Sequence, residues 1–394
     1  MRKPLFVLVA LAAVVALVAA AAQAGTRTAK VTNVSVAGWS SGPDEDALVQ
    51  QMIAAFNKSH PAIHATFNVI NGDYPTAMTA RFAAHNPPDV FYVDSSVAPG
   101  WSSQGVLQPL NGFVKKTHFN TKAFYPNLLR AFTTGKTIYG FPKDWSPLAM
   151  EIQDVALAKV GGKKAVPHNW AQLRALAVKM KAAGTAHNKP ICLSPDWARL
   201  LAFVYQNGGS ISKITSKATA QAVNFYVGLI KSGLAYTPPS GSWCGQELGE
   251  GNADIIFEGN WLLPFMSSTY SPTKYGVYPM VKEKTGGNLA FTVSWSMAKS
   301  SHVKSAAWTV LSWLVGKQGE KLWMSKGLAL SPRTDVATIG GRKPFLAAAP
   351  YVHGWGFNNF SKAYTIMNND LNAVISGQKS VATMLADAKR AIKG

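Results

Sequence analysis

Hydrophobic and polar positions in the first quarter of the chain follow the periods of strands and helices in turn. Residues 31–37 and 63–69 alternate apolar and polar side chains, whereas residues 90–93 form the unbroken apolar run of a strand covered on both faces. Between the first two runs, Pro43 precedes three acidic residues and then apolar positions at helical spacing, so a helix is predicted from Pro43. A second helix is predicted after the turn at Tyr74. This order predicts a doubly wound parallel sheet, so the expected fold class is α/β.

The rest of the chain continues the α/β pattern. The predicted elements are strands over 191–193 and 254–257, and helices after Asn169, after Pro195, over 304–315 and from Ser380. Residues 138–153 hold glycine and two prolines, so they are predicted as a crossing segment between two units rather than as a regular element. Residues 275–280 are predicted as a second crossing strand, and residues 330–333 as a third break.

One predicted strand is followed closely by a tryptophan, whose large ring could form part of a ligand site. The strand over 254–257 runs into Gly259-Asn260-Trp261, where Gly259 permits a turn that lifts the indole off the end of the strand. Strand ends of α/β sheets are common ligand sites, and a flat aromatic face suits a ring-shaped ligand. Tryptophan is also a frequent core residue, so this stretch alone leaves both interpretations open for Trp261.

The N-terminal segment has the features of a secretory signal peptide. A short basic start is followed by an apolar stretch over 5–22 and by Ala-Gln-Ala, which predicts a signal peptide over 1–24 that is cleaved after Ala24. An uncleaved membrane anchor is the alternative, because the apolar stretch approaches the length of a span. No cysteine lies near the cut, so the segment does not resemble a lipoprotein signal. We therefore expect an exported protein, periplasmic or extracellular, whose remaining length predicts two domains.

The chain is strongly basic, with 39 Lys and Arg against 19 Asp and Glu, a net charge of +20. Loss of the signal would leave about +18, because Arg2 and Lys3 lie within it. Such a balance attracts polyanions, but the lysines are scattered in ones and twos without a dense basic tract. Nucleic acid is therefore not expected as a partner, whereas an anionic ligand or binding to wall polymers stays open.

Cysteines and histidines predict no metal site. Cys192 and Cys244 are the only cysteines, so an exported chain could join them in a disulfide, with two buried thiols as the alternative. His60 and His64 are four residues apart, but an intervening proline and the following strand prevent them from sharing a helix face. The sequence also lacks a P-loop and a G-x-G-x-x-G motif. No metal or cofactor is expected.

Two sequence patterns leave an enzymatic function open. Residues 38–42 match the G-x-S-x-G of a nucleophile elbow, which would make Ser40 the nucleophile of a serine hydrolase. That elbow normally follows several strands, whereas here it follows the first, and no downstream histidine has a recognisable triad context. Asp94, Asp144 and Asp196 border aromatic-rich turns, where two of them could form a glycosidase pair or could bind sugar hydroxyls. A secreted glycoside-active enzyme or serine hydrolase is therefore the alternative function.

A series of short motifs runs along nearly the whole chain after residue 24. The series is Phe56–Pro61, Asn86–Phe91, Tyr139–Pro142, Pro167–Trp170, Gly251–Trp261, Ala306–Trp308, Ser331–Arg333 and Ser376–Ser380. In kind and order it resembles the family 1 extracellular solute-binding proteins of ABC importers, the group that contains maltose- and glycerol-phosphate-binding proteins. His168 and Asn169 depart from the family's usual proline-variable-threonine-tryptophan pattern.

The resemblance implies a two-lobe periplasmic-binding-protein fold of type II, with doubly wound sheets joined by hinge crossings. Lobe 1 would comprise residues 25–141 and 286–330, and lobe 2 residues 142–285 and 331–394. Such a protein captures a solute, here a small carbohydrate or polyol, and delivers it to the membrane permease of an ABC transporter without catalysis. We expect it to act as a monomer.

The resemblance also places the ligand contacts on loops that follow the strands of both lobes. Carried onto this chain, the predicted contacts are Trp39, Ser40, Tyr74, Asp94, Ser95, Trp145, Asp196, Trp197, Trp261, Trp295 and Tyr364. Twelve tryptophans suit this function, because sugar rings pack on indoles while Asp and Asn side chains bond the hydroxyls. About half of the twelve are expected in the core. A phosphorylated polyol stays open, with Arg333 as its candidate contact.

Overall fold

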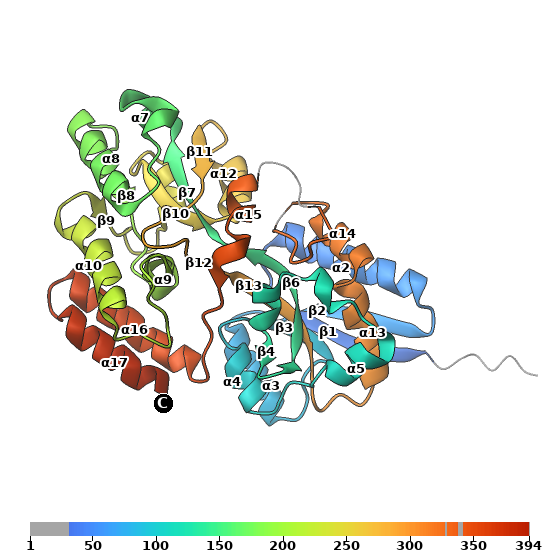
Figure 1. The fold of residues 1–394 in the computed structure, drawn as a ribbon. Coiled ribbons are helices and arrows are strands. Elements are labelled where there is room, and N and C mark those ends of the chain that lie inside the picture. The colour runs from blue at the N-terminus through green and yellow to red at the C-terminus, as the bar shows by residue number, and fades with distance from the viewer. Residues whose placement is uncertain (1–30, 328, 338–341, 394) are drawn as a thin grey trace, which may run out of the picture.

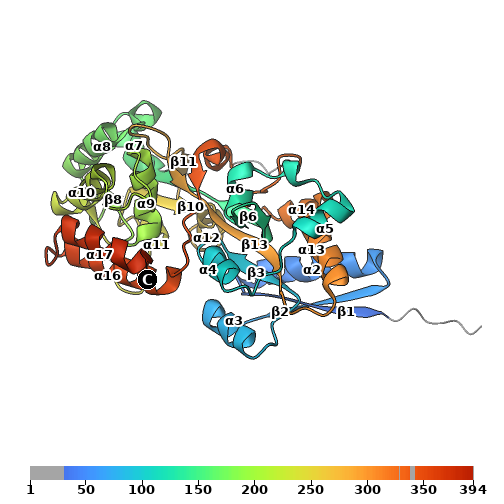
Figure 2. The same ribbon diagram turned by 60° about the horizontal axis from the view of Figure 1, so that its bottom comes forward.

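The computed structural model describes residues 31–327, 329–337 and 342–393, so the predicted signal peptide lies outside the described residues. Two five-stranded sheets, each packed against helices, form two lobes that lie side by side (Figures 1 and 2). The predicted α/β fold of two lobes is confirmed.

The sheet of lobe 1 has the strand order β2-β1-β3-β13-β6. Its strands are β1 (Thr32–Gly38), β2 (Ile63–Val69), β3 (Val90–Asp94), β6 (Gly140–Ser146) and β13 (Phe291–Met297). Strand β1 is parallel to β2 and β3, whereas β13 lies antiparallel between β3 and β6. The three predicted N-terminal strands are present, and the chain supplies a neighbour for β3 from almost two hundred residues later.

Helices of lobe 1 pack beside this sheet. They are α2 (Pro43–Ser59), α3 (Tyr74–Ala83), α4 (Ala98–Ser103), α5 (Asn111–Thr117), η1 (Thr121–Ala123), α6 (Pro126–Arg130), α13 (Lys304–Leu314) and α14 (Lys317–Met324), with a small hairpin of β4 (Thr133–Thr134) and β5 (Thr137–Ile138). Helix α2 shows why the local sequence folds as predicted. Pro43 occupies its first position, acidic residues fill the first turn where the helix dipole favours them, and Leu48, Met52 and Phe56 are buried.

The sheet of lobe 2 has the order β11-β7-β10-β8-β9. Its strands are β7 (Leu148–Gln153), β8 (Ile191–Cys192), β9 (Ala235–Tyr236), β10 (Ile255–Gly259) and β11 (Tyr275–Tyr278), and a separate pair is formed by β12 (Asn288–Leu289) and β14 (Val352–His353). The helices are α7 (Asp154–Lys159), η2 (Gly162–Ala165), α8 (Trp170–Ala183), α9 (Trp197–Gln206), α10 (Lys217–Lys231), α11 (Cys244–Gly249), α12 (Leu262–Thr269), α15 (Lys343–Leu346), η3 (Ala349–Tyr351), α16 (Phe360–Ile375) and α17 (Val381–Lys393). As predicted, Asn169 caps α8, its side chain accepting a hydrogen bond of 2.9 Å from the Gln172 amide.

The crossings between the lobes differ from the prediction in two places. Residues 138–153 are not an irregular segment, because they form β6 of the first sheet and β7 of the second on either side of Pro147. The chain therefore passes from the first sheet to the second at Pro147, a few residues after the predicted boundary at 141/142. Strand β11 is an edge strand antiparallel to β7 and does not cross. Near the third predicted break, Leu330 bridges to Trp145 beside the first crossing.

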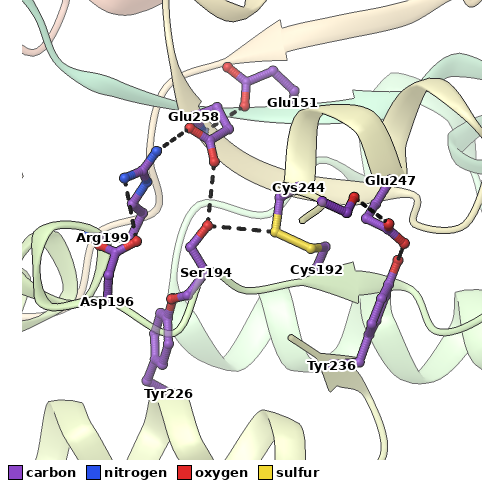
Figure 3. Close-up of a disulfide and its surroundings, with 11 residues drawn as sticks. Glu151, Cys192, Ser194, Asp196, Arg199, Tyr226, Tyr236, Cys244, Glu247 and Glu258 are labelled. Carbon is purple, nitrogen blue, oxygen red and sulfur yellow. Dashed lines mark hydrogen bonds and ion pairs between the residues drawn. A yellow bond between two sulfur atoms is a disulfide. The ribbon is translucent and has the colours of Figure 1, made fainter. Parts of the chain in front are cut away.

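A disulfide joins Cys192 and Cys244, whose Cα atoms lie 5.5 Å apart (Figure 3). Cys192 ends β8, and Cys244 begins α11, so the bond ties the sheet of lobe 2 to the helix that precedes β10. Both ends belong to lobe 2, and the bond therefore places no direct restraint on the movement of one lobe against the other.

Candidate ligand-binding site

A hollow of about 170 Å³ lies where the two lobes meet. Lobe 1 lines it with the loop after β1, the start of α2, the end of β3 and the end of β6; lobe 2 lines it with the residues after β10. The lining residues are Trp39, Ser41, Glu45, Asp94, Lys143, Asp144, Trp145, Ser146, Asn260, Trp261, Phe291, Thr292, Val293 and Ala329. Side chains from ends of strands in both sheets therefore meet at one place.

On the side of lobe 1, Trp39 follows β1 and Asp94 ends β3, and these two strands are parallel neighbours. The half-buried Trp39 indole packs edge-on against Tyr74 and Tyr92, with ring centroids 5.1 and 5.0 Å away. Asp94 accepts hydrogen bonds from the backbone and the hydroxyl of Ser96, which hold its carboxylate at the end of β3. Burial raises the pKa of Asp94, although these hydrogen bonds act in the opposite direction.

A buried lysine lies among carboxylates at the same edge of lobe 1. Lys143 is only 4% exposed, and its ammonium pairs with Asp144 and, at 3.4 Å, with Glu45. It also lies 4.0 Å from the centre of the Trp323 ring. Burial alone would lower the pKa of Lys143, but the carboxylates of Asp144 and Glu45 raise it, so the lysine is charged. Two acidic groups here share one cation.

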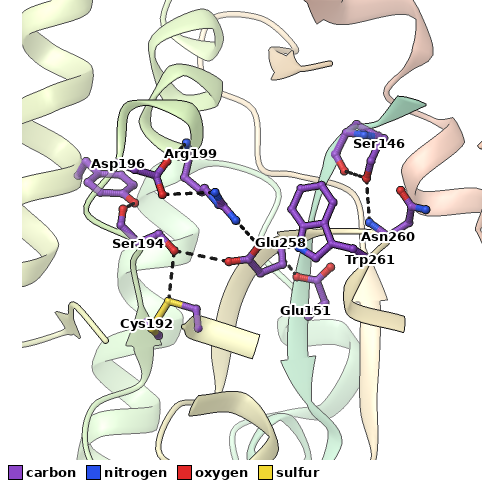
Figure 4. Close-up of polar contacts among 12 residues, drawn as sticks. Ser146, Glu151, Cys192, Ser194, Asp196, Arg199, Glu258, Asn260 and Trp261 are labelled. Atoms are coloured by element: carbon purple, nitrogen blue, oxygen red, sulfur yellow. Dashed lines mark hydrogen bonds and ion pairs between the residues drawn. A yellow bond between two sulfur atoms is a disulfide. The ribbon is translucent and has the colours of Figure 1, made fainter. Parts of the chain in front are cut away.

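On the side of lobe 2, a polar network holds Trp261 (Figure 4). The indole Nε1 donates to Glu258 at 3.1 Å, and Arg199 donates to the same carboxylate oxygen at 2.7 Å. The Arg199 guanidinium also lies 5.6 Å from the centre of the Trp261 ring and 3.4 Å from Asp196. Phe291 packs edge-on against the indole at 5.1 Å. The ring of Trp261 is therefore fixed by contacts at both its nitrogen and its edge.

Behind this network lies a second buried carboxylate. Glu151 on β7 accepts a hydrogen bond of 3.1 Å from the Glu258 amide and is fully buried. Ser194 donates to Glu258 at 3.5 Å and lies 3.8 Å from the Cys244 sulfur, so the disulfide borders the network (Figure 3). Burial raises the pKa of both glutamates, and for Glu258 the ion pair with Arg199 opposes the rise.

The structure brings several predicted residues together and places others nearby. Trp39, Asp94, Trp145 and Trp261 line the hollow, although Trp145 is only 1% exposed and its indole donates to the Ser331 carbonyl at 2.9 Å. Asp196 joins the network through Arg199 while it caps α9. The half-buried Tyr364 packs at 5.4 Å against Trp355, whose ring in turn contacts Phe291.

Other predicted residues lie inside the lobes. Trp197 is fully buried and donates to the Met367 carbonyl at 2.8 Å, because it opens a helix in which every residue except Arg199 is buried. Trp295 is 2% exposed and packs against Tyr92 at 4.4 Å. Tyr74 lies beneath Trp39 and donates to the Tyr92 carbonyl at 3.0 Å. These three rings support the site from within and do not line the hollow.

Three more predicted residues lie away from the hollow. The exposed Ser40 donates to Asp46 at 2.6 Å instead of facing the hollow, which Ser41 lines. Ser95 is buried and lines a different cavity. Arg333, the candidate phosphate contact, is 6% exposed and binds Asp335 through two nitrogens at 2.9 and 3.0 Å, so its guanidinium is already occupied.

That different cavity is larger, about 440 Å³, and lies elsewhere along the boundary between the lobes. Its walls include α4, α6 and the segment 352–356. Polar groups there already bond one another, since Asn127 donates to the carbonyls of Ala349 and Val352, and Tyr205 donates to that of Gly354. We favour the smaller hollow as the ligand site because an indole from each lobe and carboxylates from lobe 1 line it.

The sequence predicted Asp94, Asp144 and Asp196, but it gave no prediction for four other charged residues, Glu45, Lys143, Arg199 and Glu258. Glu45 resembled a helix-start residue, Lys143 lay within a segment predicted as irregular, and Arg199 and Glu258 resembled ordinary helix and strand positions. A usable signal was present at Glu258, because an acidic residue within an apolar strand usually has a buried partner.

Neither a metal-binding cluster nor a membrane-spanning helix is found among the described residues. Among residues 31–327, 329–337 and 342–393, no group of three or more His, Cys, Asp or Glu side chains is arranged to hold a metal ion. Within the same ranges, no helix combines the length and apolar character that crossing a bilayer requires.

Two lobes of α/β structure, with an aromatic and acidic hollow at their boundary, define a two-lobe solute-binding protein. The model of the bacterial extracellular solute-binding protein family matches residues 39–321, and the chain belongs to this family. A binding protein of Brucella abortus is 24% identical over 371 residues, which cover 86% of this chain and 87% of that protein.

Solved structures share the fold at low sequence identity. An ABC substrate-binding protein from Listeria monocytogenes in complex with cycloalternan has a TM-score of 0.80 at 19% identity, covering 92% of this chain and 98% of that one. The sugar-binding protein MalE from Xanthomonas citri has 0.78 at 18%, covering 92% and 96%. UgpB from Mycobacterium tuberculosis in complex with glycerophosphocholine has 0.77 at 15%, covering 91% and 97%.

Proposed function

We propose that this protein is an exported solute-binding protein that holds a sugar or sugar-like solute between its lobes and performs no catalysis. The observation that supports this most directly is that Trp39 from lobe 1 and Trp261 from lobe 2 line the same hollow. Asp94, at the end of β3, lines it too. Indole surfaces pack on the C–H faces of a pyranose, and carboxylates accept hydrogen bonds from its hydroxyls. Three of the structural neighbours were solved with cycloalternan, tagatose or maltose bound.

The charges of the hollow favour a neutral or amino-bearing solute over an anionic one. Glu45, Asp94 and Asp144 line it, and Lys143, the one cation among the described lining residues, is already paired with two of them. A phosphate would therefore meet repulsion and find no free ammonium. Although UgpB, one neighbour in fold, holds glycerophosphocholine, the local electrostatics here disfavour a polyol phosphate.

Ligand would favour closure of the lobes because it contacts both of them at once. The crossing at Pro147 separates two strands, β6 and β7, that belong to different rigid sheets, so rotation near this residue would move one lobe against the other. In the closed form the protein, acting as a monomer, would dock on the permease of an ABC transporter. The segment over 1–24 would direct export and be removed after Ala24.

A thermal-shift screen of the protein tests the proposal. The panel holds neutral mono- and oligosaccharides, amino sugars and polyol phosphates, followed by isothermal titration of each hit. We expect a carbohydrate to raise the melting temperature, and the Trp39→Ala/Trp261→Ala variant to lose that shift. A shift by polyol phosphates alone would contradict the proposed ligand class, and sugar products released during incubation would contradict the absence of catalysis.

A further inference from the structure

The positive charge of the chain is concentrated in one part of lobe 2. Residues 154–231 contain eleven Lys and Arg but two acidic residues, Asp154 and Asp196. Asp196 is paired with Arg199 at the ligand network, which leaves ten basic residues against one acidic residue, Asp154. The segment supplies nearly half of the net charge of +20 in about a fifth of the length.

These residues belong to elements at the end of lobe 2 that is remote from lobe 1. Figures 1 and 2 both show α7, α8 and α10 at that end. We call the set the basic face, and its exposed members are Lys159, Lys163, Lys164, Arg174, Lys179, Lys181, Lys217 and Lys231. The ends of α8 and α10 come together here, because a Cβ built on Gly233 would lie 3.1 Å from the Lys181 ammonium.

Exposed valines lie among these lysines. Over the described residues, the exposed large hydrophobic side chains are Val31, Val155 and Val178. Val155 lies on α7 and Val178 on α8. Val178 is 50% exposed and lies between Arg174 and Lys181 on the outward side of α8, opposite the buried Leu173, Ala177 and Met180. Val155, 65% exposed, is one helical turn from Lys159, and α7 packs against α8.

We propose that the basic face binds the surface of an anionic lipid bilayer. Lysines and arginines near such a surface gain attraction from each acidic headgroup, and valines among them gain by entering the boundary between headgroups and acyl chains. A soluble acidic polymer would use the lysines but leave the valines in water, so the combination favours lipid. Bound in this way, lobe 2 would rest on the membrane while lobe 1 stays free to rotate about the crossing at Pro147. The protein would thus be concentrated at the membrane that holds its permease.

Vesicle sedimentation tests this with two matched variants. Lys163→Glu/Lys164→Glu reverses an adjacent pair of exposed lysines on the basic face, and Lys115→Glu/Lys116→Glu reverses an equivalent exposed pair on α5 of lobe 1. We expect the unaltered protein to partition onto vesicles of phosphatidylcholine with one quarter phosphatidylglycerol at low salt, and not onto pure phosphatidylcholine. The first variant should lose roughly tenfold or more in partition, and the second less than about twofold. Equal losses would show that only net charge acts and would overturn the basic face as a site.

A third variant distinguishes lipid from a soluble polyanion. Val155→Ser/Val178→Ser keeps every charge, so it should weaken partition onto the anionic vesicles severalfold while leaving binding to polyglutamate unchanged. Unchanged vesicle binding by this variant would overturn the lipid assignment in favour of a polymer. Circular dichroism and melting temperature verify that each variant is folded. Sugar binding should persist in all of them, so failure here is separable from failure of the proposed function.

Discussion

Replacing Trp261 with alanine should weaken ligand binding strongly without unfolding the protein. The indole lies at the boundary of the lobes, where the Phe291 ring packs against it at right angles with ring centroids 5.1 Å apart, and Glu258 accepts a hydrogen bond of 3.1 Å from its nitrogen. A ring that is pre-positioned in this way gives up little freedom when a sugar packs on it, so most of the contact energy appears as affinity. By comparison with aromatic hot spots, Trp261→Ala should cost roughly 2–3 kcal/mol, or roughly 30- to 150-fold in Kd.

Two further variants divide this loss into parts. Trp261→Phe keeps an aromatic face but removes the donor to Glu258, and it should cost about 1 kcal/mol, or roughly fivefold. Trp243→Ala is the matched control, because Trp243 is a half-buried indole of lobe 2 that packs on Phe265 at 4.7 Å away from the hollow. It should lower the melting temperature and leave Kd unchanged.

Isothermal titration with the solute identified by thermal shift measures these effects, with the melting temperature of each variant recorded in parallel. Affinity for Trp261→Ala within twofold of the unaltered protein would refute the role of this ring as a platform. An equal loss in Trp243→Ala would refute it as well, since the effect would then come from general damage to lobe 2.

Three other predictions concern stability and the alternative enzyme. Burial raises the pKa of Asp254 to about 6 from 3.8, so the folded state holds this proton more tightly and the free energy of unfolding falls as pH rises from 4 to 6. Asp254→Asn, which keeps an acceptor for Thr185, should therefore stabilise the protein by about 1 kcal/mol at pH 7.5 after allowance for solvent screening, and not at pH 4; a gain equal at both would contradict this. Cys192→Ala/Cys244→Ala should lower the free energy of unfolding in urea by roughly 4 kcal/mol, because the bond closes a loop with a sequence separation of 52; a loss below about 1 kcal/mol would show that the loop is ordered without it. Ser40→Ala should leave ligand binding unchanged, and a hydrolytic activity that disappears in this variant would restore the serine-hydrolase alternative.

The sequence allowed much of the fold to be predicted because its periodicity is local. Alternation in β1 and β2, the acidic first turn of α2 and the cap at Asn169 each depend on a few neighbouring residues, and each appears in the structure. Residues 138–153 do cross between the two sheets as predicted, but the two strands within them were missed for the same reason. Proline and glycine mark breaks, but they also occur in β6, where Gly140 must be small because a Cβ there would lie 2.4 Å from the hydroxyls of Ser294 and Ser296.

The site was predicted less completely, because burial is not a local property. Trp39, Trp197, Trp261 and Trp295 all follow or lie within strands and helix starts, yet two line the hollow and two are core. For Trp295, the face of β13 on which it lies depends on the pairing of that strand with β3, which joins residues about two hundred positions apart. The charged partners were missed for a related reason: Lys143 of lobe 1 meets Glu45 from about a hundred residues earlier.

The position of β13 also bears on how the polypeptide acquires its structure. Strands β3 and β6 are separated in the sheet by a strand that begins at Phe291, so an emerging chain cannot complete its first sheet until nearly three quarters of it is available. By then residues 148–278, with both cysteines, are already present. They can fold as an insertion within lobe 1, whose sheet is still incomplete. Long-range pairing of this kind slows folding, and it would leave the edges of β3 and β6 open for longest. Export in an unfolded state, which the predicted signal peptide would direct, would benefit from that delay.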